Sequence, residues 1–272
     1  MESTSFDPRR FRSTVPFYAR YRLAYPARLI ARVIEITGLQ RSDAVLDLGS
    51  GPGLLAIPFA EAGMRVTAVD PEPDMLDAAR EAAEAAGVDL DLRQGSSFTL
   101  PGDLGPVGLV TIGRAFHWMD RRQTLRDLDR VVAPGGAIAL FGDDHPKTAE
   151  NAWRFKLREI CDRYGRSAMA HVERAADPAF RNDESLLLDS PFSKLERIGI
   201  VIRRQITAEE VVGLAYSLSS SSPEKLGERA ASFERELRQE LSKIASDGRF
   251  TEIAELEALV ARRSGSGPLE PK

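Results

Sequence analysis

Features that would place a chain in a specialised class are scarce in this sequence of 272 residues. Its single cysteine, Cys161, can form no disulfide within the chain, and nothing has the spacing of a cysteine zinc site. No stretch approaches the roughly 20 apolar residues that span a bilayer. The N-terminus also lacks the apolar run of a signal peptide. These absences predict a cytoplasmic protein that has no membrane partner.

A basic surplus is also missing. The chain has 37 Lys and Arg against 41 Asp and Glu, which gives a formal net charge of −4. Proteins that bind duplexes usually neutralise phosphates with a basic stripe, whereas the arginine doublets here, such as 203–204 and 262–263, are scattered and expected to be solvated. The composition therefore predicts no nucleic-acid partner, and a monomer or homodimer is expected.

Strand and helix patterns alternate from about residue 26 to 142. Apolar runs predict strands at 44–48, 65–70, 89–94, 107–112 and 137–141, and helical spacing predicts helices at 26–37, 54–63, 73–87 and 122–132. Pro58 is expected to kink the second helix, and the residues at 134–136 are expected to form a turn. This alternation predicts an α/β fold with a doubly wound, mostly parallel sheet and helices on both faces.

The second half of the chain has a different pattern. Helices are predicted at 147–165, 208–218 and 223–245, and an alternating strand at 193–204. The segment 251–263 is ambiguous, because Ile253, Leu256 and Val260 fit a helix by spacing alone.

The stretch VLDLGSGPG, residues 45–53, carries the most chemical information. A buried strand delivers Asp47 to its end, and the glycines that follow allow the backbone to approach a ligand closely. Such a loop could also hold a dinucleotide or make only a tight turn. A carboxylate just before the glycines would repel a pyrophosphate but suits a ligand that carries an ammonium and a sulfonium.

Asp70 ends the next predicted strand. An acidic side chain at that place can accept hydrogen bonds from two ribose hydroxyls. The alternative is a capping role for Asp70 at the helix that starts near Pro73.

The order of VLDLGSGPG, TAVDPEPDML, AFHWMD and RVVAPGGAIAL resembles the class I S-adenosylmethionine-dependent methyltransferases. It is similar in particular to their small-molecule branch, which includes ubiquinone-biosynthesis and trans-aconitate enzymes. The resemblance implies S-adenosyl-L-methionine as cofactor and a Rossmann-like seven-stranded sheet that ends in antiparallel strands. It therefore favours a strand rather than a helix for the ambiguous segment 251–263.

The resemblance also implies a domain organisation. Residues 1–25 would cover the cofactor site, 26–142 would form the cofactor-binding core, and 143–248 a helical substrate cap with the sixth strand. Residues 249–263 would be the last strand, and 264–272 a disordered tail.

Carried onto this sequence, the family pattern gives a set of candidate cofactor-binding residues. They are Tyr18, Tyr21, Arg22, Asp47, Gly49, Ser50, Gly51, Asp70, Pro71, Ser96, Ser97, Arg114 and Ala115. Two positions depart from the pattern. Ser96 and Ser97 stand where relatives often have an aspartate, and Gly108 stands where many have an acidic residue at the start of the fourth strand.

Methyl transfer from a sulfonium needs alignment, and a base only when the acceptor is a hydroxyl or an acidic carbon. His117 is the candidate base, with Trp118 and His145 as further substrate contacts. No metal site is predicted, because the Asp143, Asp144 and His145 run lacks another matching ligand. Two alternatives stay open, a non-catalytic cofactor-binding protein and an NAD(P)-dependent oxidoreductase.

Overall fold

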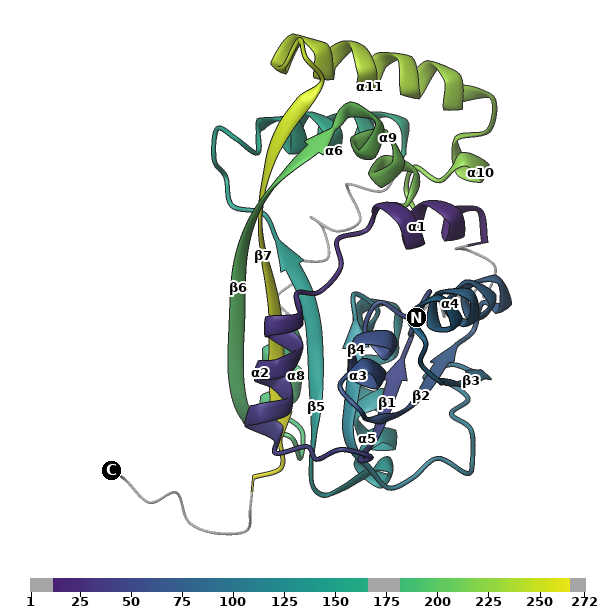
Figure 1. Ribbon diagram of the computed structural model, residues 1–272, viewed down its shortest axis with the longest axis vertical. Coiled ribbons are helices and arrows are strands. Elements are labelled where there is room, and N and C mark those ends of the chain that lie inside the picture. Colours follow the sequence, from purple (N-terminus) through teal and green to yellow (C-terminus); the bar gives the residue numbers. More distant parts are fainter. Residues whose placement is uncertain (1–11, 166–181, 265–272) are drawn as a thin grey trace. The chain divides into compact units, whose positions relative to one another are not determined.

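The computed structural model describes residues 12–165 and 182–264 (Figure 1). A seven-stranded sheet has the order β3-β2-β1-β4-β5-β7-β6. The strands are β1 (Ala44–Leu48), β2 (Arg65–Asp70), β3 (Asp91–Gln94), β4 (Val107–Gly113), β5 (Val132–Asp144), β6 (Lys194–Thr207) and β7 (Arg249–Arg262). Strands β1 to β5 pair in parallel, and β7 runs against its neighbours (Figure 1). The predicted Rossmann-like, mostly parallel sheet is thereby confirmed.

Helices connect most of these strands. They are α1 (Val15–Tyr21), α2 (Ala27–Thr37), α3 (Ala56–Glu61), α4 (Pro73–Ala86), α5 (Arg121–Val131), α6 (Ala152–Tyr164), α8 (Asp183–Leu188), α9 (Ala208–Tyr216), α10 (Pro223–Leu226) and α11 (Ala230–Ile244). The predicted helix over 223–245 is divided at Gly227, whose φ of 52° and ψ of −130° leave the helical region. Pro58 lies in the first turn of α3, where its missing N–H breaks no helical bond.

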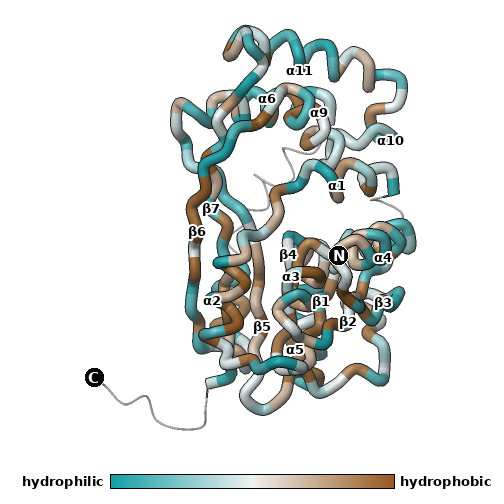
Figure 2. The backbone as a smooth tube through the Cα atoms, in the orientation of Figure 1, coloured by the Kyte–Doolittle hydropathy of each residue, from teal (hydrophilic) through white to brown (hydrophobic). Residues whose placement is uncertain are grey.

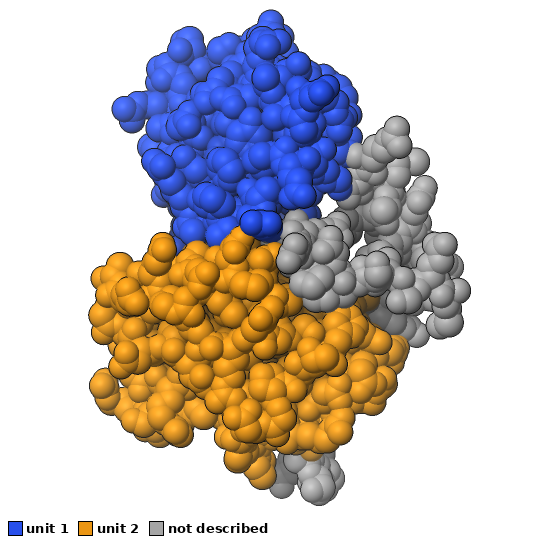
Figure 3. Space-filling model, turned by 90° about the vertical axis from the view of Figure 1, so that its right-hand side faces the viewer, with its two compact units in different colours: residues 1–24, 143–180, 201–255 blue, residues 25–142, 181–200, 256–272 orange. Residues whose placement is uncertain are grey.

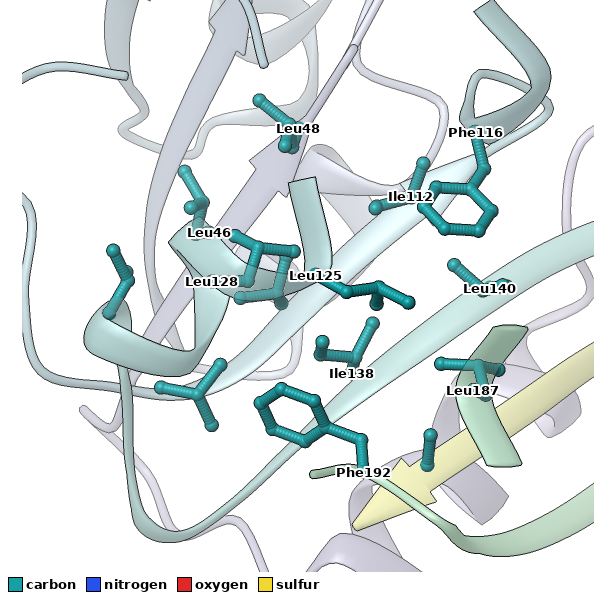
Figure 4. Close-up of a cluster of buried hydrophobic side chains, with 14 of the residues drawn as sticks. Leu46, Leu48, Ile112, Phe116, Leu125, Leu128, Ile138, Leu140, Leu187 and Phe192 are labelled. Carbon is teal, nitrogen blue, oxygen red and sulfur yellow. The ribbon is translucent and has the colours of Figure 1, made fainter. Parts of the chain in front are cut away.

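Strand alternation assigns the two faces of the sheet. Leu46 and Leu48 of β1 face α5 and α8, and they pack into one apolar cluster with Leu128 and Leu187 (Figure 4). On the other face, Phe59 of α3 packs edge-on against Phe141 of β5. Helices therefore cover both faces, and the odd-numbered residues of β1 point toward α3.

Two segments of the sheet differ from simple pattern expectations. The predicted turn at 134–136 lies inside β5, which pairs with β4 through a register shift. Gly136 permits this, because a Cβ there would lie 2.8 Å from Val132 Cγ1 and 2.9 Å from the Gly108 oxygen. The ambiguous segment belongs to β7, as the family resemblance favoured. Its inward residues at 252, 254, 256 and 258 are all buried.

The chain divides into two compact units (Figure 3). One, here called the sheet unit, comprises residues 25–142, 181–200 and 256–272. The other, the helical unit, comprises residues 1–24, 143–180 and 201–255. Hydrophobic residues follow β1 and β2 of the sheet unit, whereas hydrophilic residues follow much of α11 in the helical unit (Figure 2). The predicted tail 264–272 lies almost wholly outside the described residues.

Within the described ranges, every helix is too short or too polar to serve as a membrane span.

Candidate functional site at the carboxyl ends of the strands

Asp47 is the most deeply buried of the described acids of the sheet unit, with 1% of its surface exposed. Strand alternation turns it toward α3, whose Ala56 N–H donates to Asp47 Oδ2 at 3.1 Å. Thr111 of β4 is its direct register partner and donates its hydroxyl to Asp47 Oδ1 at 2.9 Å. Burial raises the pKa of Asp47 to about 7, although both hydrogen bonds oppose the shift.

Asp70 ends β2 and is also buried. Its Oδ2 accepts the Gly51 N–H at 2.8 Å, and its Oδ1 accepts the Glu72 N–H at 2.9 Å. Burial raises the pKa of Asp70 to about 6, again against the hydrogen bonds. The capping role considered for Asp70 belongs instead to Glu72, which accepts the Asp74 N–H at the start of α4.

The three buried acids Asp47, Asp70 and Glu72 repel one another. The charge of Asp70 raises the pKa of Asp47, and the charge of Glu72 raises the pKa of Asp70. A cation bound near these strand ends would relieve the repulsion, whereas a diphosphate would increase it. The charge of the site therefore disfavours a dinucleotide.

The glycine loop links these acids to the end of β4. Gly49 has a φ of 73°, and a Cβ built on it would lie 2.7 Å from Ala115 Cβ, so the loop lies directly against the residues that follow β4. The N–H groups of Gly49 and Ser50 both donate to the Val69 oxygen, at 2.8 and 3.1 Å. The structure thus brings the predicted residues Gly49, Ser50 and Ala115 together.

The turn after β3 contains Ser96 and Ser97, where relatives often have an aspartate. Ser96 and Thr99 exchange backbone hydrogen bonds, and the Ser96 Oγ accepts the Phe98 N–H at 3.2 Å. Ser97 is buried, whereas Phe98 is exposed. The Ser96 hydroxyl therefore shapes the turn itself.

The segment after β4 carries basic and aromatic side chains. Arg114 has a φ of 55°, and its guanidinium lies over the Tyr25 ring at 4.6 Å from the centroid. Phe116 is buried and anchors a short 3₁₀ turn, Phe116–Trp118. The exposed His117 ring lies 4.7 Å from that of Trp118.

Gly108 explains one departure from the family pattern. A Cβ built on it would lie 2.9 Å from Leu39 Cδ2, so the start of β4 packs directly under that side chain. A larger acidic residue at this position would displace Leu39.

Comparison with known proteins shows which family this architecture belongs to. The family model for a methyltransferase domain matches residues 45–136. An uncharacterised methyltransferase of Mycobacterium bovis is 30% identical over 209 residues, which cover 77% of this chain and 76% of the relative. The chain belongs to the S-adenosylmethionine-dependent methyltransferases.

Other similarities agree with this family. A methyltransferase-like protein of Schizosaccharomyces pombe is 26% identical over 214 residues, or 78% of each chain. A proposed type II methyltransferase from Anaeromyxobacter dehalogenans shares the fold with a TM-score of 0.63, at 21% identity over 89% of this chain and 98% of its own. A methyltransferase from Thiobacillus denitrificans, solved with S-adenosyl-L-homocysteine, has a TM-score of 0.54 at 18% identity over 95% and 99%.

Other predicted residues of the methyltransferase lie in the helical unit. Tyr21 packs flat on α9, because a Cβ on Gly213 would lie 2.3 Å from its ring. Arg22 donates to the Ser217 oxygen at 3.3 Å and lies over the Tyr18 ring at 4.9 Å. The N-terminal aromatic and arginine side chains are therefore part of the packing of α1 and α9.

His145 belongs to a buried charge cluster of the same unit. Its Nε2 lies 3.2 Å from Glu252 Oε1, and its Nδ1 lies 3.5 Å from Asp143 Oδ2. Glu252 also pairs with Arg154 at 3.1 Å and Arg204 at 2.6 Å. Within residues 12–165 and 182–264, no group of three acidic, histidine or cysteine side chains could hold a metal ion.

Several of these contacts have no signal in the sequence. Thr111 carried no signal by itself, because its importance follows from its register opposite Asp47. Tyr25, which supports Arg114, stood just before a predicted helix and resembled an ordinary core residue. The burial of Glu252 was hidden in a segment whose secondary structure was ambiguous.

Proposed function

We propose that this methyltransferase transfers a methyl group to an O, N or C atom of a small-molecule acceptor. The observation that carries the proposal is the arrangement at the strand ends, where buried carboxylates and a glycine loop adjoin a segment with an exposed histidine. The acids suit a cationic cofactor, and Ala115 brings the β4 segment against Gly49. The balanced charge of the chain supports a small acceptor over a nucleic acid.

The residues present fit S-adenosyl-L-methionine. The buried hydroxyl of Ser50 has no hydrogen-bond partner among the described residues. The space beside Gly51 is open, since a Cβ built on it would have Met75 Sδ, at 3.9 Å, as its one neighbour within 4 Å among the described residues. Asp70 would hold the ribose, with Pro71 and Glu72 beside the adenine, and Asp47 would orient the ammonium directly or through water. When bound, the cofactor supplies an electrophilic methyl group on its sulfonium.

The chain's own contribution is alignment of the acceptor and, where needed, removal of a proton. His117 is exposed, and its ring is restrained by contact with Trp118, so it can accept a proton from a hydroxyl or acidic carbon. An acceptor with a ready lone pair needs only positioning and exclusion of water. The roles that the family resemblance gives to Tyr18, Tyr21, Arg22 and His145 stay predictions.

The test is calorimetric titration of the full chain with S-adenosylmethionine, S-adenosylhomocysteine and NADH. We expect the first two to bind with micromolar affinity and NADH not to bind. Asp70→Ala should weaken both by tenfold or more, because it removes the buried acceptor at the ribose position. Asp77→Ala is the matched control, since Asp77 is exposed on α4 and its ion-pair partner among the described residues is Arg80.

The competing functions give different results. Binding of NADH with no binding of S-adenosylmethionine would support an oxidoreductase. Cofactor binding without turnover of any acceptor in a metabolite screen, and with no slow loss of the methyl group, would support a non-catalytic binding protein. Sedimentation of the same sample would distinguish the proposed monomer from the homodimer.

A further inference from the structure

Asp47 lies in a row of small side chains that crosses the sheet. The strand registers align four buried residues side by side, which are Ala68 of β2, Asp47 of β1, Thr111 of β4 and Ala139 of β5. Ala68 and Ala139 offer only methyl groups to their neighbours. The hydroxyl that this row brings to the acid is therefore that of Thr111, whose Oγ1 donates to Asp47 Oδ1 at 2.9 Å.

The next row on the same face of the sheet is wholly apolar. It consists of the buried residues Val66, Val45, Leu109 and Ala137. Burial in these surroundings raises the pKa of Asp47 to about 7, and the charge of Asp70, at the end of the neighbouring β2, raises it further. Among the described residues, the groups that act on this pKa include no cation. The charge of Asp47 therefore depends on the hydrogen bonds that the carboxylate accepts and on any cation that binds beside it.

The two hydrogen bonds to Asp47 come from different elements and engage different oxygens. The Ala56 N–H at the start of α3 donates to Oδ2, and the Thr111 hydroxyl of β4 donates to Oδ1. Together they fix the orientation of the carboxylate. Both lower the pKa of Asp47, and the effect of Thr111 is the larger of the two. Because the Ala56 donor belongs to the backbone, Thr111 is the donor through which the amino-acid sequence controls this charge.

We propose that Thr111 is a positioning residue for cofactor binding, which holds the Asp47 carboxylate charged and in a fixed orientation for the ammonium of S-adenosylmethionine. This inference rests on the proposed function, in which Asp47 orients that ammonium directly or through water. Thr111 is fully buried, so it acts through Asp47 rather than by contact with a ligand. Its hydroxyl thereby extends cofactor binding to lower pH.

The experiment measures the affinity of the full chain and of Thr111→Val for S-adenosylmethionine by calorimetry at pH 6, 7, 8 and 9. Loss of a hydrogen bond to the charged carboxylate should raise the pKa of Asp47 by about one unit. The variant should therefore bind about tenfold more weakly than the unmodified chain at pH 6, about fivefold more weakly at pH 7 and within about twofold at pH 9. Comparison at each pH removes the titration of the ligand's own amine.

Three controls separate this role from a purely structural one. Thr111→Ser keeps the hydroxyl and should restore binding to within about twofold of the unmodified chain at every pH. Thr124→Val removes a hydroxyl that is also buried but has no hydrogen-bond partner among the described residues, so it should leave the affinity unchanged. 5′-Methylthioadenosine lacks the amino-acid portion of the cofactor, and its affinity should be the same in Thr111→Val and in the unmodified chain.

Unchanged binding of S-adenosylmethionine by Thr111→Val at pH 6 would overturn the inference. A loss that is equal at all four pH values, or that extends to 5′-methylthioadenosine, would overturn it as well, because Thr111 would then only stabilise the strands. If circular dichroism shows that Thr111→Val does not fold, Thr111→Ala removes the same hydroxyl with a smaller side chain and is held to the same outcomes. Failure of S-adenosylmethionine to bind the unmodified chain at any pH would instead refute the proposed function.

Discussion

At the scale of single residues, the site depends on how each buried polar group is satisfied. Asp47 is buried, yet it accepts hydrogen bonds from a hydroxyl and a backbone N–H on two different elements. A buried carboxylate with fewer partners would be neutral at physiological pH. The pairing with Thr111 therefore favours the charged form that a cationic cofactor requires.

Thr111→Val tests this pairing, because the substitution keeps the shape of the side chain and removes its hydroxyl. We expect a loss of about 1–3 kcal/mol in the free energy of unfolding at pH 8, where Asp47 is charged. The loss should be smaller at pH 5.5, where Asp47 is protonated because its folded pKa is about 7. Urea unfolding at the two pH values measures both quantities.

Thr124→Val is the matched control for this comparison. The Thr124 hydroxyl is equally buried but has no hydrogen-bond partner within the described part of the chain. Its removal should leave stability unchanged or raise it at both pH values. Equal effects of the two substitutions would show that the Asp47 hydrogen bond contributes nothing to stability.

Single residues also show where sequence patterns mislead. The doublet 262–263 is expected to be solvated, but Arg263 donates to Asp129 Oδ1 and to the Ala133 oxygen at 2.8 Å each. It also lies over the Phe192 ring at 4.8 Å. An arginine can cover apolar surface with its stem while its head satisfies the carbonyls at a helix end, and no local pattern records this.

At the scale of elements, the sequence predicts the parallel core well, because its strands are short, buried and separated by glycine or proline. Asp47, Asp70 and the glycine loop are placed by this pattern alone, since strand ends in a parallel sheet meet at one edge. The elements that local pattern misplaces or leaves ambiguous depend on distant contacts. The segment at 134–136 joins β5 because Gly136 can approach β4 closely, and β7 forms because it has strand neighbours to pair with.

Four elements of the helical unit meet at Glu252 of β7. Burial would raise its pKa, but hydrogen bonds from His145 at the end of β5 and Arg204 of β6, together with Arg154 of α6, lower it instead. We expect Glu252→Gln to cost about 1.5–3 kcal/mol, because the partly exposed guanidiniums of Arg154 and Arg204 lose the charged partner of their hydrogen bonds. Chemical denaturation monitored by tryptophan fluorescence would measure the loss, since Trp153 lies beside this cluster and donates to the Thr251 oxygen.

Glu257→Gln provides the comparison on the same strand. Glu257 pairs with Arg197 near the surface, where an ion pair typically contributes less than about 1 kcal/mol. A cost for Glu252→Gln no larger than that of Glu257→Gln would show that burial of the cluster does not determine its contribution.

At the scale of the whole molecule, the acids of the site link cofactor binding to pH. Asp47 and Asp70 have pKa values of about 7 and 6 and are partly protonated in the unliganded chain between pH 5.5 and 7. A cationic ligand favours their charged forms, so its binding must release protons over this range. The affinity for S-adenosylmethionine should therefore rise by about tenfold or more between pH 5.5 and 8.

S-adenosylhomocysteine separates this effect from general changes in the protein, because it lacks the methyl group and the sulfonium charge but keeps the ribose, the adenine and the ammonium. Its affinity should rise less over the same pH range, so the ratio of the two dissociation constants should change in favour of S-adenosylmethionine. Calorimetry at pH 6.5 in buffers of different ionisation enthalpy would count the released protons directly. A ratio of dissociation constants that stays constant from pH 5.5 to 8 would mean that the charges of Asp47 and Asp70 do not interact with the sulfonium. The two carboxylates would then have a structural role at the strand ends.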